Sequence, residues 1–326
     1  MYNKVLVTGG TGSFGMAFVE KLVKSGLASK IIVFSRDELK QFDMQSKIKN
    51  ESIEYVIGDV RDLSRVEEVL NGVDLVVHAA AMKQITASEN NPMEAIKTNI
   101  IGAQNIVTAS INAKVKKVLA LSTDKAANPA NLYGATKLCS DKIMISGNSK
   151  FDNSTTKFSI VRYGNVIGSR GSVVPFFIEK SKSGTIPITD IKMTRFWLSI
   201  NDGVSFVLSS IDRMYGGEIF IPKIPSFRVI DVAKVVAPNA KIEIIGIRQG
   251  EKLHEIMITE DDSYNTVEFD DHYAILSSSL KESKHYKKNG KKVEIGFRYS
   301  SDNNTEWHTL DSFKSVLISN NLLLNY

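Results

Sequence analysis

The sequence predicts an α/β protein in which a doubly wound parallel sheet is followed by a smaller C-terminal lobe. Up to about residue 163, six short apolar runs alternate with helical patterns, as in a parallel sheet covered by helices on both faces. The first run turns directly through a glycine-rich segment into a helix. Past residue 165 the alternation stops. We therefore expect a first domain over 1–165 and a second over 166–326, with some segments of the second returning to the core of the first.

The composition is that of an ordinary globular protein. The 326 residues are 43% hydrophobic and 24% charged, which suits one large domain or two coupled ones. No apolar run approaches the ~18 residues of a membrane span, and the N-terminus enters a strand without a signal-peptide pattern. The single cysteine, Cys139, cannot form an intramolecular disulfide, which fits a reducing compartment. We expect a cytoplasmic protein without membrane insertion.

Charge and histidine usage argue against two other classes of function. The net charge is +5, but the lysines are scattered and no aromatic-basic module appears, so we expect no nucleic-acid partner. A small polyanionic ligand explains the positive excess as well. The five histidines show no metal-ligand spacing, and we expect no metal site.

The first strand, residues 4–8, runs through a glycine-rich turn into a helix over 16–24. Gly9, Gly12 and Gly15 allow a tight turn, close approach of a pyrophosphate to backbone N–H groups, and close packing of the helix on the strand. This strand–turn–helix arrangement is typical of a dinucleotide-binding Rossmann domain. The cofactor-binding residues expected here are Gly9, Thr11, Gly12, Ser13, Phe14 and Gly15.

The second strand, residues 30–34, ends in Ser35-Arg36-Asp37. An acidic residue at this position binds the ribose diol of NAD, whereas a hydroxyl and a guanidinium suit the 2′-phosphate of NADP. Arg36 therefore favours NADP over NAD. Asp37 is also explained as an ordinary acid at a helix start. We place Ser35, Arg36 and Lys40 among the cofactor contacts.

The third strand, residues 54–57, leads into Asp59 and Val60, both expected at the cofactor. Asp59 could accept a hydrogen bond from an adenine amino group. Asp62 just beyond it is placed to cap the next helix.

The fourth strand, residues 75–78, is followed by small residues, of which Ala79 and Ala80 would let a cofactor lie against the backbone. A helical pattern over 92–113 contains Asn99, also assigned to the cofactor site. Asn99 either helps to fix the catalytic lysine through water or is a satisfied core amide. Both interpretations stay open at this point.

The fifth apolar run, residues 118–121, precedes the densest group of potential acids and bases. Thr123, Asp124 and Lys125 emerge where this buried strand ends. Ligands of open α/β sheets bind at the carboxyl ends of the strands. We therefore expect these three side chains at the catalytic centre.

Tyr133 and Lys137 follow, separated by four residues. On a helix this spacing puts both side chains on one face and brings an ammonium near a phenol. A nearby cation lowers the pKa of tyrosine from about 10, so the pair predicts a tyrosine base. The alternative is a buried tyrosine beside a solvated lysine.

After a sixth strand over 158–163, the pattern changes to a Gly/Ser-rich loop that carries one arginine, Arg170. Such loops wrap phosphates or bases of ligands. The segments 194–197 and 248–255 add two further arginines. We expect this part of the chain to close over the first domain.

The glycine turn, the Tyr133/Lys137 pair and Thr123 together resemble the extended short-chain dehydrogenase/reductases, the family of nucleotide-sugar epimerases and dehydratases. The resemblance is closer to the inverting UDP-N-acetylglucosamine 4,6-dehydratases, which include the first enzyme of pseudaminic acid biosynthesis, and runs from about residue 4 to 258. Its motifs are Met82-Lys-Gln84, Leu121-Ser-Thr-Asp-Lys-Ala-Ala-Asn-Pro129, Asn131-Leu-Tyr-Gly-Ala-Thr-Lys137, the segment 162–175, Met193-Thr-Arg-Phe-Trp197 and Arg248-x-Gly-Glu-Lys-Leu-His-Glu255. The chain departs from the family pattern at Ile85-Thr86 and Asn90, near the sugar pocket.

The resemblance implies a homo-oligomer that binds a UDP-sugar and a tightly held NADP that is not consumed. It implies catalytic roles for Thr123, Asp124, Lys125, Tyr133 and Lys137, and it adds Val166 to the cofactor contacts. Lys83 would lie on the sugar side. The other substrate-binding residues it implies are Asn165, Arg170, Gly171, Ser172, Val173, Thr194, Arg195, Arg248 and Glu251.

The implied reaction is dehydration of UDP-N-acetylglucosamine with inversion at C5. Tyr133 takes the C4 hydroxyl proton while hydride leaves C4; Lys125 removes the acidified C5 proton, Asp124 protonates the departing C6 hydroxyl, and hydride returns to C6. The product is UDP-2-acetamido-2,6-dideoxy-β-L-arabino-hex-4-ulose, for bacterial surface or flagellin glycans. Lysine is a base only when neutral, so we expect a lowered pKa for Lys125 and a raised one for Asp124.

Two other functions are weighed against this one. A UDP-sugar 4-epimerase uses the same Tyr/Lys pair but needs no acid–base pair for elimination, so Asp124 and Lys125 count against it. A non-catalytic NADP-binding regulator would tolerate loss of Tyr133 or Lys137, and both are present.

Overall fold

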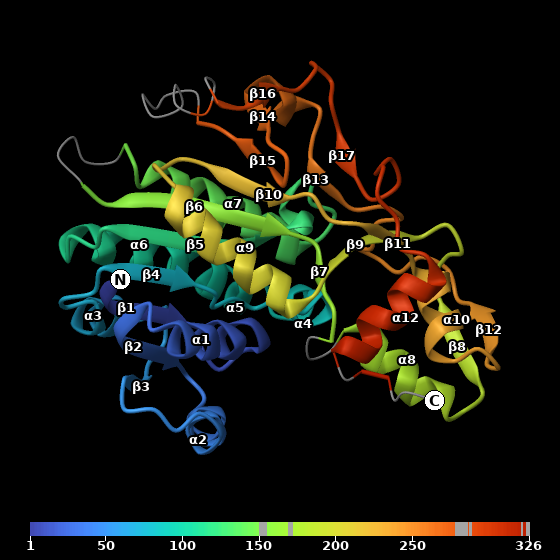
Figure 1. Cartoon of the computed structure of the whole chain (residues 1–326), viewed down its shortest axis with the longest axis horizontal. Coiled ribbons are helices and arrows are strands. Elements are labelled where there is room, and N and C mark those ends of the chain that lie inside the picture. Colours follow the sequence, from blue (N-terminus) through green and yellow to red (C-terminus); the bar gives the residue numbers. More distant parts are fainter. Residues whose placement is uncertain (150–154, 169–171, 278–285, 287–288, 321, 324–326) are drawn as a thin grey trace.

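The computed structural model describes residues 1–149, 155–168, 172–277, 286, 289–320 and 322–323. Its centre is a ten-stranded sheet with the order β3-β2-β1-β4-β5-β6-β10-β15-β14-β16 (Figure 1). The first seven of these run parallel, and the last three are antiparallel. The strands are β1 (Tyr2–Thr8), β2 (Ala28–Ser35), β3 (Ile53–Ile57), β4 (Leu75–His78), β5 (Lys117–Thr123), β6 (Lys157–Tyr163), β10 (Ile219–Pro222), β14 (Thr266–Glu268), β15 (His272–Ile275) and β16 (Lys291–Lys292).

The order β3-β2-β1-β4-β5-β6 is that of a doubly wound Rossmann sheet, so the predicted fold class is confirmed. All six predicted strands are present. Five of them are largely buried on both faces, which explains why they read as apolar runs, whereas the edge strand β3 is only partly buried. In β1, for example, Val5 and Val7 pack into one core cluster and Leu6 into the other.

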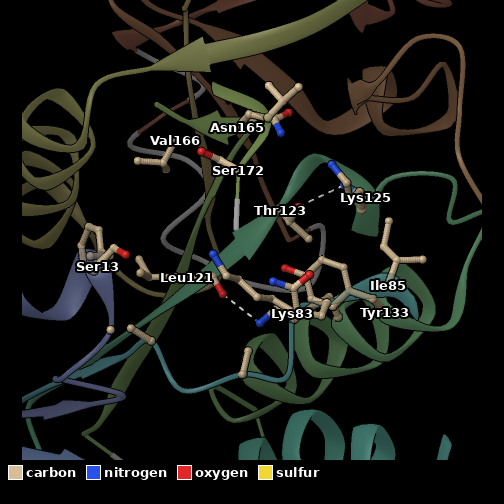
Figure 2. Close-up of a pocket in the computed structure, with 18 of the residues that line it drawn as sticks. Ser13, Lys83, Ile85, Leu121, Thr123, Lys125, Tyr133, Asn165, Val166 and Ser172 are labelled. Atoms are coloured by element: carbon tan, nitrogen blue, oxygen red, sulfur yellow. Dashed lines mark hydrogen bonds between the residues drawn. The ribbon is translucent and has the colours of Figure 1, made fainter. Parts of the chain in front are cut away.

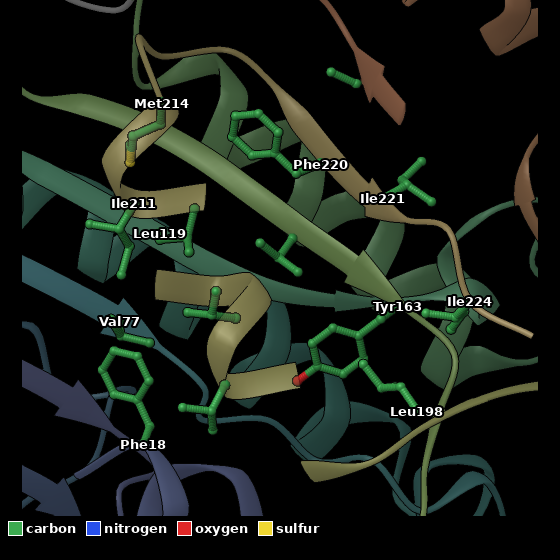
Figure 3. Close-up of a cluster of buried hydrophobic side chains, with 14 of the residues drawn as sticks. Phe18, Val77, Leu119, Tyr163, Leu198, Ile211, Met214, Phe220, Ile221 and Ile224 are labelled. Atoms are coloured by element: carbon green, nitrogen blue, oxygen red, sulfur yellow. The ribbon is translucent and has the colours of Figure 1, made fainter. Parts of the chain in front are cut away.

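Helices cover both faces of the sheet. One face carries α1 and α9, which pack side by side. Phe18 of α1 and Ile211 of α9 share a core cluster with the strand residues Val77, Leu119 and Phe220 (Figure 3). The other face carries α3, α6 and α7. The helices around the sheet are α1 (Ser13–Ser25), α2 (Glu38–Lys47), α3 (Leu63–Val69), α4 (Ile85–Asn90), α5 (Pro92–Ile96), α6 (Gly102–Asn112), α7 (Leu132–Ser146) and α9 (Ile200–Arg213).

The helix predicted over 92–113 is interrupted. Between α5 and α6, residues 97–101 form a π-helical turn that contains Asn99. Single π turns inside helices occur frequently at functional sites. No helix among the described residues is long and apolar enough to cross a membrane.

A smaller lobe lies at one end of the sheet (Figure 1). It consists of α8 (Val173–Ser181), α10 (Val229–Val236), α12 (Leu310–Ser319), the strand pair β8 (Thr185–Ile188) with β12 (Lys241–Ile244), and the three-stranded sheet of β7 (Asn165–Val166), β9 (Thr194–Leu198) and β11 (Ser226–Arg228). The short strands β13 (Ile256–Ile258) and β17 (Tyr299–Ser300) pair nearby. Its core is aromatic: the rings of Phe227 and Phe313 stack with centroids 4.1 Å apart, and Trp197 packs on Phe313 at 5.0 Å.

The second half of the chain builds both parts of the molecule. It supplies the small lobe, and it also returns to the main sheet with α9, β10, β14, β15 and β16. This crossing back places loops of the small lobe over the carboxyl ends of the parallel strands. The division at residue 165 stays a prediction.

Candidate active site

A cavity of about 1290 Å³ lies between the carboxyl ends of the parallel strands and the small lobe. Its walls come from both parts of the chain: the glycine turn after β1, the ends of β2 to β6, and the segments around β7, α8 and residues 248–255. A cavity of this size holds a dinucleotide together with a second ligand.

The glycine turn has the tight geometry that the sequence predicts. A Cβ atom at Gly9, whose φ is +63°, would lie 2.8 Å from Ala80 Cα, and one at Gly15 would lie 2.6 Å from the carbonyl oxygen of Gly9. Gly12 is the N-cap of α1 and has no side chain to occupy the first-turn N–H groups. These features fit a pyrophosphate at the start of α1. All six predicted turn residues line the cavity.

At the end of β2, Asp37 and Arg36 have different tasks. Asp37 is the N-cap of α2: its Oδ1 accepts from the Lys40 backbone N–H at 3.0 Å, and its Oδ2 accepts from Lys40 Nζ at 2.5 Å. Its interpretation as an acid at a helix start is therefore confirmed. The Arg36 side chain is 57% exposed at the cavity rim, and Nη1 lies 3.5 Å from Asp59 Oδ2. The Arg36 guanidinium is thus accessible at the rim of the cavity.

The neighbouring predictions at this side of the cavity have mixed outcomes. Asp62 caps α3, as predicted. Asp59 lines the cavity, but its Oδ2 is already 2.7 Å from Arg61 Nη2. Other predicted cofactor contacts that line the cavity are Ser35, Lys40, Val60, Ala79, Ala80 and Val166.

Asn99 does not line the cavity; it is buried among the helices below it. Its Nδ2 donates to Thr136 Oγ1 at 3.0 Å and to the Met82 carbonyl at 3.0 Å, and its Oδ1 accepts from the Met82 N–H at 2.8 Å. The core-amide interpretation accounts for all of these contacts. Asn99 therefore ties the loop after β4 to α7, and no water link to a lysine is needed.

At the end of β5 the chain forms a tight turn over residues 124–126 that clusters three polar side chains. The Thr123 hydroxyl donates to Asp124 Oδ1 at 2.9 Å, and Lys125 Nζ donates to the same oxygen at 3.1 Å. Lys125 faces the cavity with Thr123 and Tyr133 (Figure 2). Asp124 lies fully buried behind them.

The electrostatics of this pair confirm one predicted pKa direction and reverse the other. Burial raises the pKa of Asp124, as an acid requires. Burial alone would lower the pKa of Lys125, but the negative charges of Asp124 and Glu255 outweigh it, and the pKa is raised. The expected lowering of the Lys125 pKa is therefore wrong for this structure. The reason is the second carboxylate, whose Oε1 lies 3.0 Å from Lys125 Nζ.

Tyr133 and Lys137 share one face of α7, and both line the cavity. Burial raises the pKa of Tyr133 to about 12, against the lowering effects of the Lys125 charge and a hydrogen bond with Thr123. The predicted lowering of the Tyr133 pKa is thus wrong, because burial outweighs the Lys125 charge and the hydrogen bond with Thr123. Lys137 Nζ donates to the Leu121 carbonyl at 2.8 Å. Burial lowers the pKa of Lys137.

The residues predicted to bind substrate that line the cavity are Lys83, Asn165, Ser172, Val173, Arg248 and Glu251, together with Arg195, which is described below. Among the described residues, Asn165 Oδ1 and the Ser172 hydroxyl are buried without a hydrogen-bond partner. Buried polar atoms are normally paired, so these two fit a ligand. Arg170 and Gly171 lie outside the described residues.

Two predicted substrate residues have structural partners. Thr194 Oγ1 lies 2.7 Å from both His254 Nδ1 and Ser301 Oγ, and Thr194 does not line the cavity. Arg195 does line it, but its guanidinium donates to the carbonyls of Thr194, Lys252 and Leu253. The guanidinium fastens β9 to the segment that carries Glu255.

Glu255 lines the cavity against Lys125, and the sequence interpretation did not assign it. It lies in the segment 248–255, from which only Arg248 and Glu251 were assigned. The motif contained Glu255, but nothing in the spacing placed it against Lys125.

The strand order and the cavity at the carboxyl ends of the strands define a protein with the doubly wound Rossmann fold. The chain matches the family described as "Polysaccharide biosynthesis protein" over residues 5–277, and it belongs to this family.

Two curated relatives carry different activities in their names. UDP-N-acetylglucosamine 4,6-dehydratase (inverting) of Campylobacter jejuni subsp. jejuni serotype O:2 is 55% identical over 319 residues, covering 94% of this chain and 95% of the relative. A protein named UDP-glucose 4-epimerase from Rickettsia canadensis is 39% identical, covering 99% and 96%. The dehydratase is thus the more similar of the two.

Solved structures share the architecture. The X-ray structure of Pen from Bacillus thuringiensis has a TM-score of 0.91 at 36% identity and covers 98% of both chains. The dTDP-glucose 4,6-dehydratase DesIV from Streptomyces venezuelae, solved with NAD and TYD bound, has a TM-score of 0.70 at 22% identity, covering 77% of this chain and 86% of its own. The latter shows the shared fold.

Proposed function

We propose that this protein is a UDP-N-acetylglucosamine 4,6-dehydratase that inverts C5, and that it is therefore a hydro-lyase. The observation that carries the proposal is the Asp124/Lys125 pair beside Tyr133 at the end of β5, which joins an elimination acid and base to an oxidation site. The 55% identity to a relative of that name supports it. The product would serve bacterial surface or flagellin glycans, such as those containing pseudaminic acid.

The cavity fits NADP. The glycine turn would hold the pyrophosphate, Arg36 the 2′-phosphate, and Tyr133 with Lys137 the nicotinamide side. When bound, the nicotinamide accepts hydride from C4 and returns it to C6, so the cofactor is not consumed. Side chains of the protein carry out the proton transfers.

Tyr133 removes the proton of the C4 hydroxyl. Its raised pKa means that the phenolate depends on the Lys125 charge and on the hydrogen bond with Thr123, because burial opposes it. Lys137, held by the Leu121 carbonyl, keeps a cation on the same helix face. Tyr133, Lys125, Thr123 and Lys137 therefore act together in the first proton transfer.

Asp124 and Lys125 carry out the elimination. At 3.1 Å, the ammonium proton of Lys125 can pass to the Asp124 carboxylate, which gives a neutral amine beside a neutral acid. The amine takes the C5 proton, and the acid gives its proton to the departing C6 oxygen, so water leaves. The ion pair is regenerated. C5 then takes up a solvent proton on the face opposite to the one that Lys125 deprotonated, which inverts it, and Tyr133 releases to solvent the proton it took from the C4 hydroxyl.

The substrate's nucleotide would lie against Asn165, Ser172 and Arg248, with Lys83 on the sugar side. The oxygens of Asn165 and Ser172, which have no hydrogen-bond partner in the described part of the chain, support this placement. We also propose a homo-oligomer in the cytoplasm, where nucleotide sugars are made.

Incubation with UDP-N-acetylglucosamine, followed by NMR of the product, tests the proposal. A 4-keto-6-deoxy sugar nucleotide is expected from the wild type and not from Asp124→Asn. The 4-epimer would instead select the UDP-sugar 4-epimerase function, which the name of the Rickettsia relative favours. Unchanged substrate would select an NADP-binding regulator.

A further inference from the structure

Glu255 reaches the catalytic turn from the far side of the cavity. Its side chain is 2% exposed, and Oε1 lies 3.0 Å from Lys125 Nζ. Lys125 Nζ therefore forms ion pairs with two carboxylates, because Asp124 Oδ1 also lies 3.1 Å from it. The proposed chemistry uses Asp124 and leaves Glu255 without a role.

The segment around Glu255 is fastened to both parts of the molecule. Asn131 Nδ2, at the start of α7, donates to the Gly250 carbonyl at 2.8 Å, and Lys252 Nζ donates to the Ala127 carbonyl at 2.9 Å. The Glu255 N–H donates to Ser301 Oγ at 2.9 Å. The carboxylate is therefore placed by its own backbone and does not merely follow Lys125.

The charged and titratable groups around this contact come from four parts of the chain. Asp124 and Lys125 face it from the turn after β5, Tyr133 from α7, and Arg195 from β9, with Nε at 3.8 Å from Glu255 Oε1. Lys252 Nζ lies 3.6 Å from Oε2. Oε2 is buried and has no hydrogen-bond partner among the described residues, so the Glu255 charge is held chiefly by its three cationic neighbours.

We propose that Glu255 is a positioning residue that holds the Lys125 ammonium between catalytic cycles and sets how readily Lys125 becomes a neutral base. This inference rests on the proposed function for its catalytic consequence. The contact itself does not depend on that function. Arg248, which is proposed to bind the substrate's nucleotide, lies on the same segment as Glu255.

The sign of the effect follows from the charges. Glu255 stabilises the charged form of Lys125 and raises its pKa, while burial acts in the opposite direction. Glu255→Gln keeps the size and one hydrogen-bonding oxygen but removes the charge. The pKa of Lys125 should then fall, and more of the amine is neutral at a given pH.

The test is the rate at which each lysine is labelled by reductive methylation with formaldehyde, measured by peptide mass spectrometry across a range of pH. Only the neutral amine reacts, and Lys125 lies at the cavity with 18% of its side chain exposed. In Glu255→Gln, the pH at which Lys125 labelling reaches half its maximal rate should move down by about one pH unit or more. We call this pH the midpoint. Glu255→Asp should restore much of the wild-type midpoint.

Glu260→Gln is the matched control, because Glu260 is an exposed carboxylate just beyond β13. It should leave the Lys125 midpoint in place. An unchanged midpoint in Glu255→Gln would overturn the inference. The inference would also be overturned if, in the wild type, Lys125 were labelled with a midpoint at or below that of the exposed Lys21. This comparison does not depend on any variant folding.

The same variants separate this inference from the proposed function. If the protein is a dehydratase, the acidic limb of kcat/KM against pH should move to lower pH in Glu255→Gln and stay in place in Glu260→Gln. If no dehydration occurs in the wild type, the proposed function fails while the labelling result still decides the role of Glu255. A shifted midpoint without a shifted pH profile would show that Glu255 does not set the active range, and would overturn the inference.

Discussion

Lys137 Nζ donates a 2.8 Å hydrogen bond to the carbonyl oxygen of Leu121, which fixes its ammonium near the carboxyl end of strand β5. The lysine is buried, and it is positioned by the sheet before any ligand binds. Tyr133, one helical turn away, is fixed by the same helix. The oxidation site is therefore preorganised by β5 and α7 together.

Tyr133→Phe should remove the first chemical step. The phenol is the group placed to take the C4 hydroxyl proton, so turnover should fall by at least about a hundredfold. Transient reduction of bound NADP on adding substrate should disappear, while the affinity for the UDP-sugar stays within a few-fold. Stopped-flow absorbance and calorimetry measure the two quantities. Wild-type turnover by the phenylalanine variant would leave the phenol with a packing role only.

Arg36→Ala should weaken NADP binding and leave NAD binding nearly unchanged. A charge-assisted contact contributes about 1.5–3 kcal/mol, which is roughly a ten- to hundredfold change in affinity. Because NAD lacks the 2′-phosphate, its affinity in the same variant is the internal control. If the ratio of NADP affinity to NAD affinity were the same in wild type and variant, Arg36 would be rejected as the 2′-phosphate contact.

Gly134→Ala should displace the catalytic turn. A Cβ at Gly134, in the first turn of α7, would lie 2.2 Å from the Lys125 carbonyl oxygen, and backbone must move to admit it. We expect a large loss of activity in a protein that still binds NADP. Gly203→Ala in α9 is the control, since its nearest neighbour would be Leu198 Cδ1 at 3.4 Å. Replacing this helical glycine should raise stability by about 0.5–1 kcal/mol. Equal activities in the two variants would contradict the packing argument.

His78 should make stability fall on the acid side of neutrality. Burial, helped by the Lys137 charge, lowers its pKa from 6.5 to about 3. The unfolded chain therefore binds a proton below pH 6.5 that the folded protein does not, and the free energy of unfolding decreases as pH falls from 6.5 towards 3. Between pH 6.5 and 5 this single group contributes about 2 kcal/mol.

His78→Asn tests this, because an amide can keep a hydrogen bond to Thr8, whose hydroxyl lies 2.8 Å from His78 Nδ1. Urea unfolding at pH 7 and pH 5 gives the change in stability for each protein. The wild type should lose more stability than the variant. Equal losses would mean that His78 already binds a proton in the folded state.

Much of the fold could be predicted because its signals are local. A strand buried on both faces reads as an apolar run, and the turn from β1 into α1 requires glycine, as the 2.6 Å approach at Gly15 shows. The helix spacing of Tyr133 and Lys137 is equally local. These features needed no knowledge of tertiary contacts.

What could not be predicted depends on segments that meet only in the folded chain. A return to the main sheet was expected, but the sequence did not indicate that β10 would pair with β6 or that the segment carrying Glu255 would cross to Lys125. The raised pKa values of Tyr133 and Lys125 follow from burial and from that second carboxylate. Arg195 shows the same limit, because its carbonyl partners come from a distant segment. Residue type and spacing carry no information about such partners.

The central claim is that Asp124 and Lys125 eliminate water and that C5 is then reprotonated on the face opposite to Lys125. The most direct measurement is the reaction of UDP-N-acetylglucosamine in D₂O, with NMR of the early product. The account predicts an L-configured 4-keto-6-deoxy sugar that carries deuterium at C5. A D-configured 4-keto product, or one with hydrogen retained at C5, would contradict it.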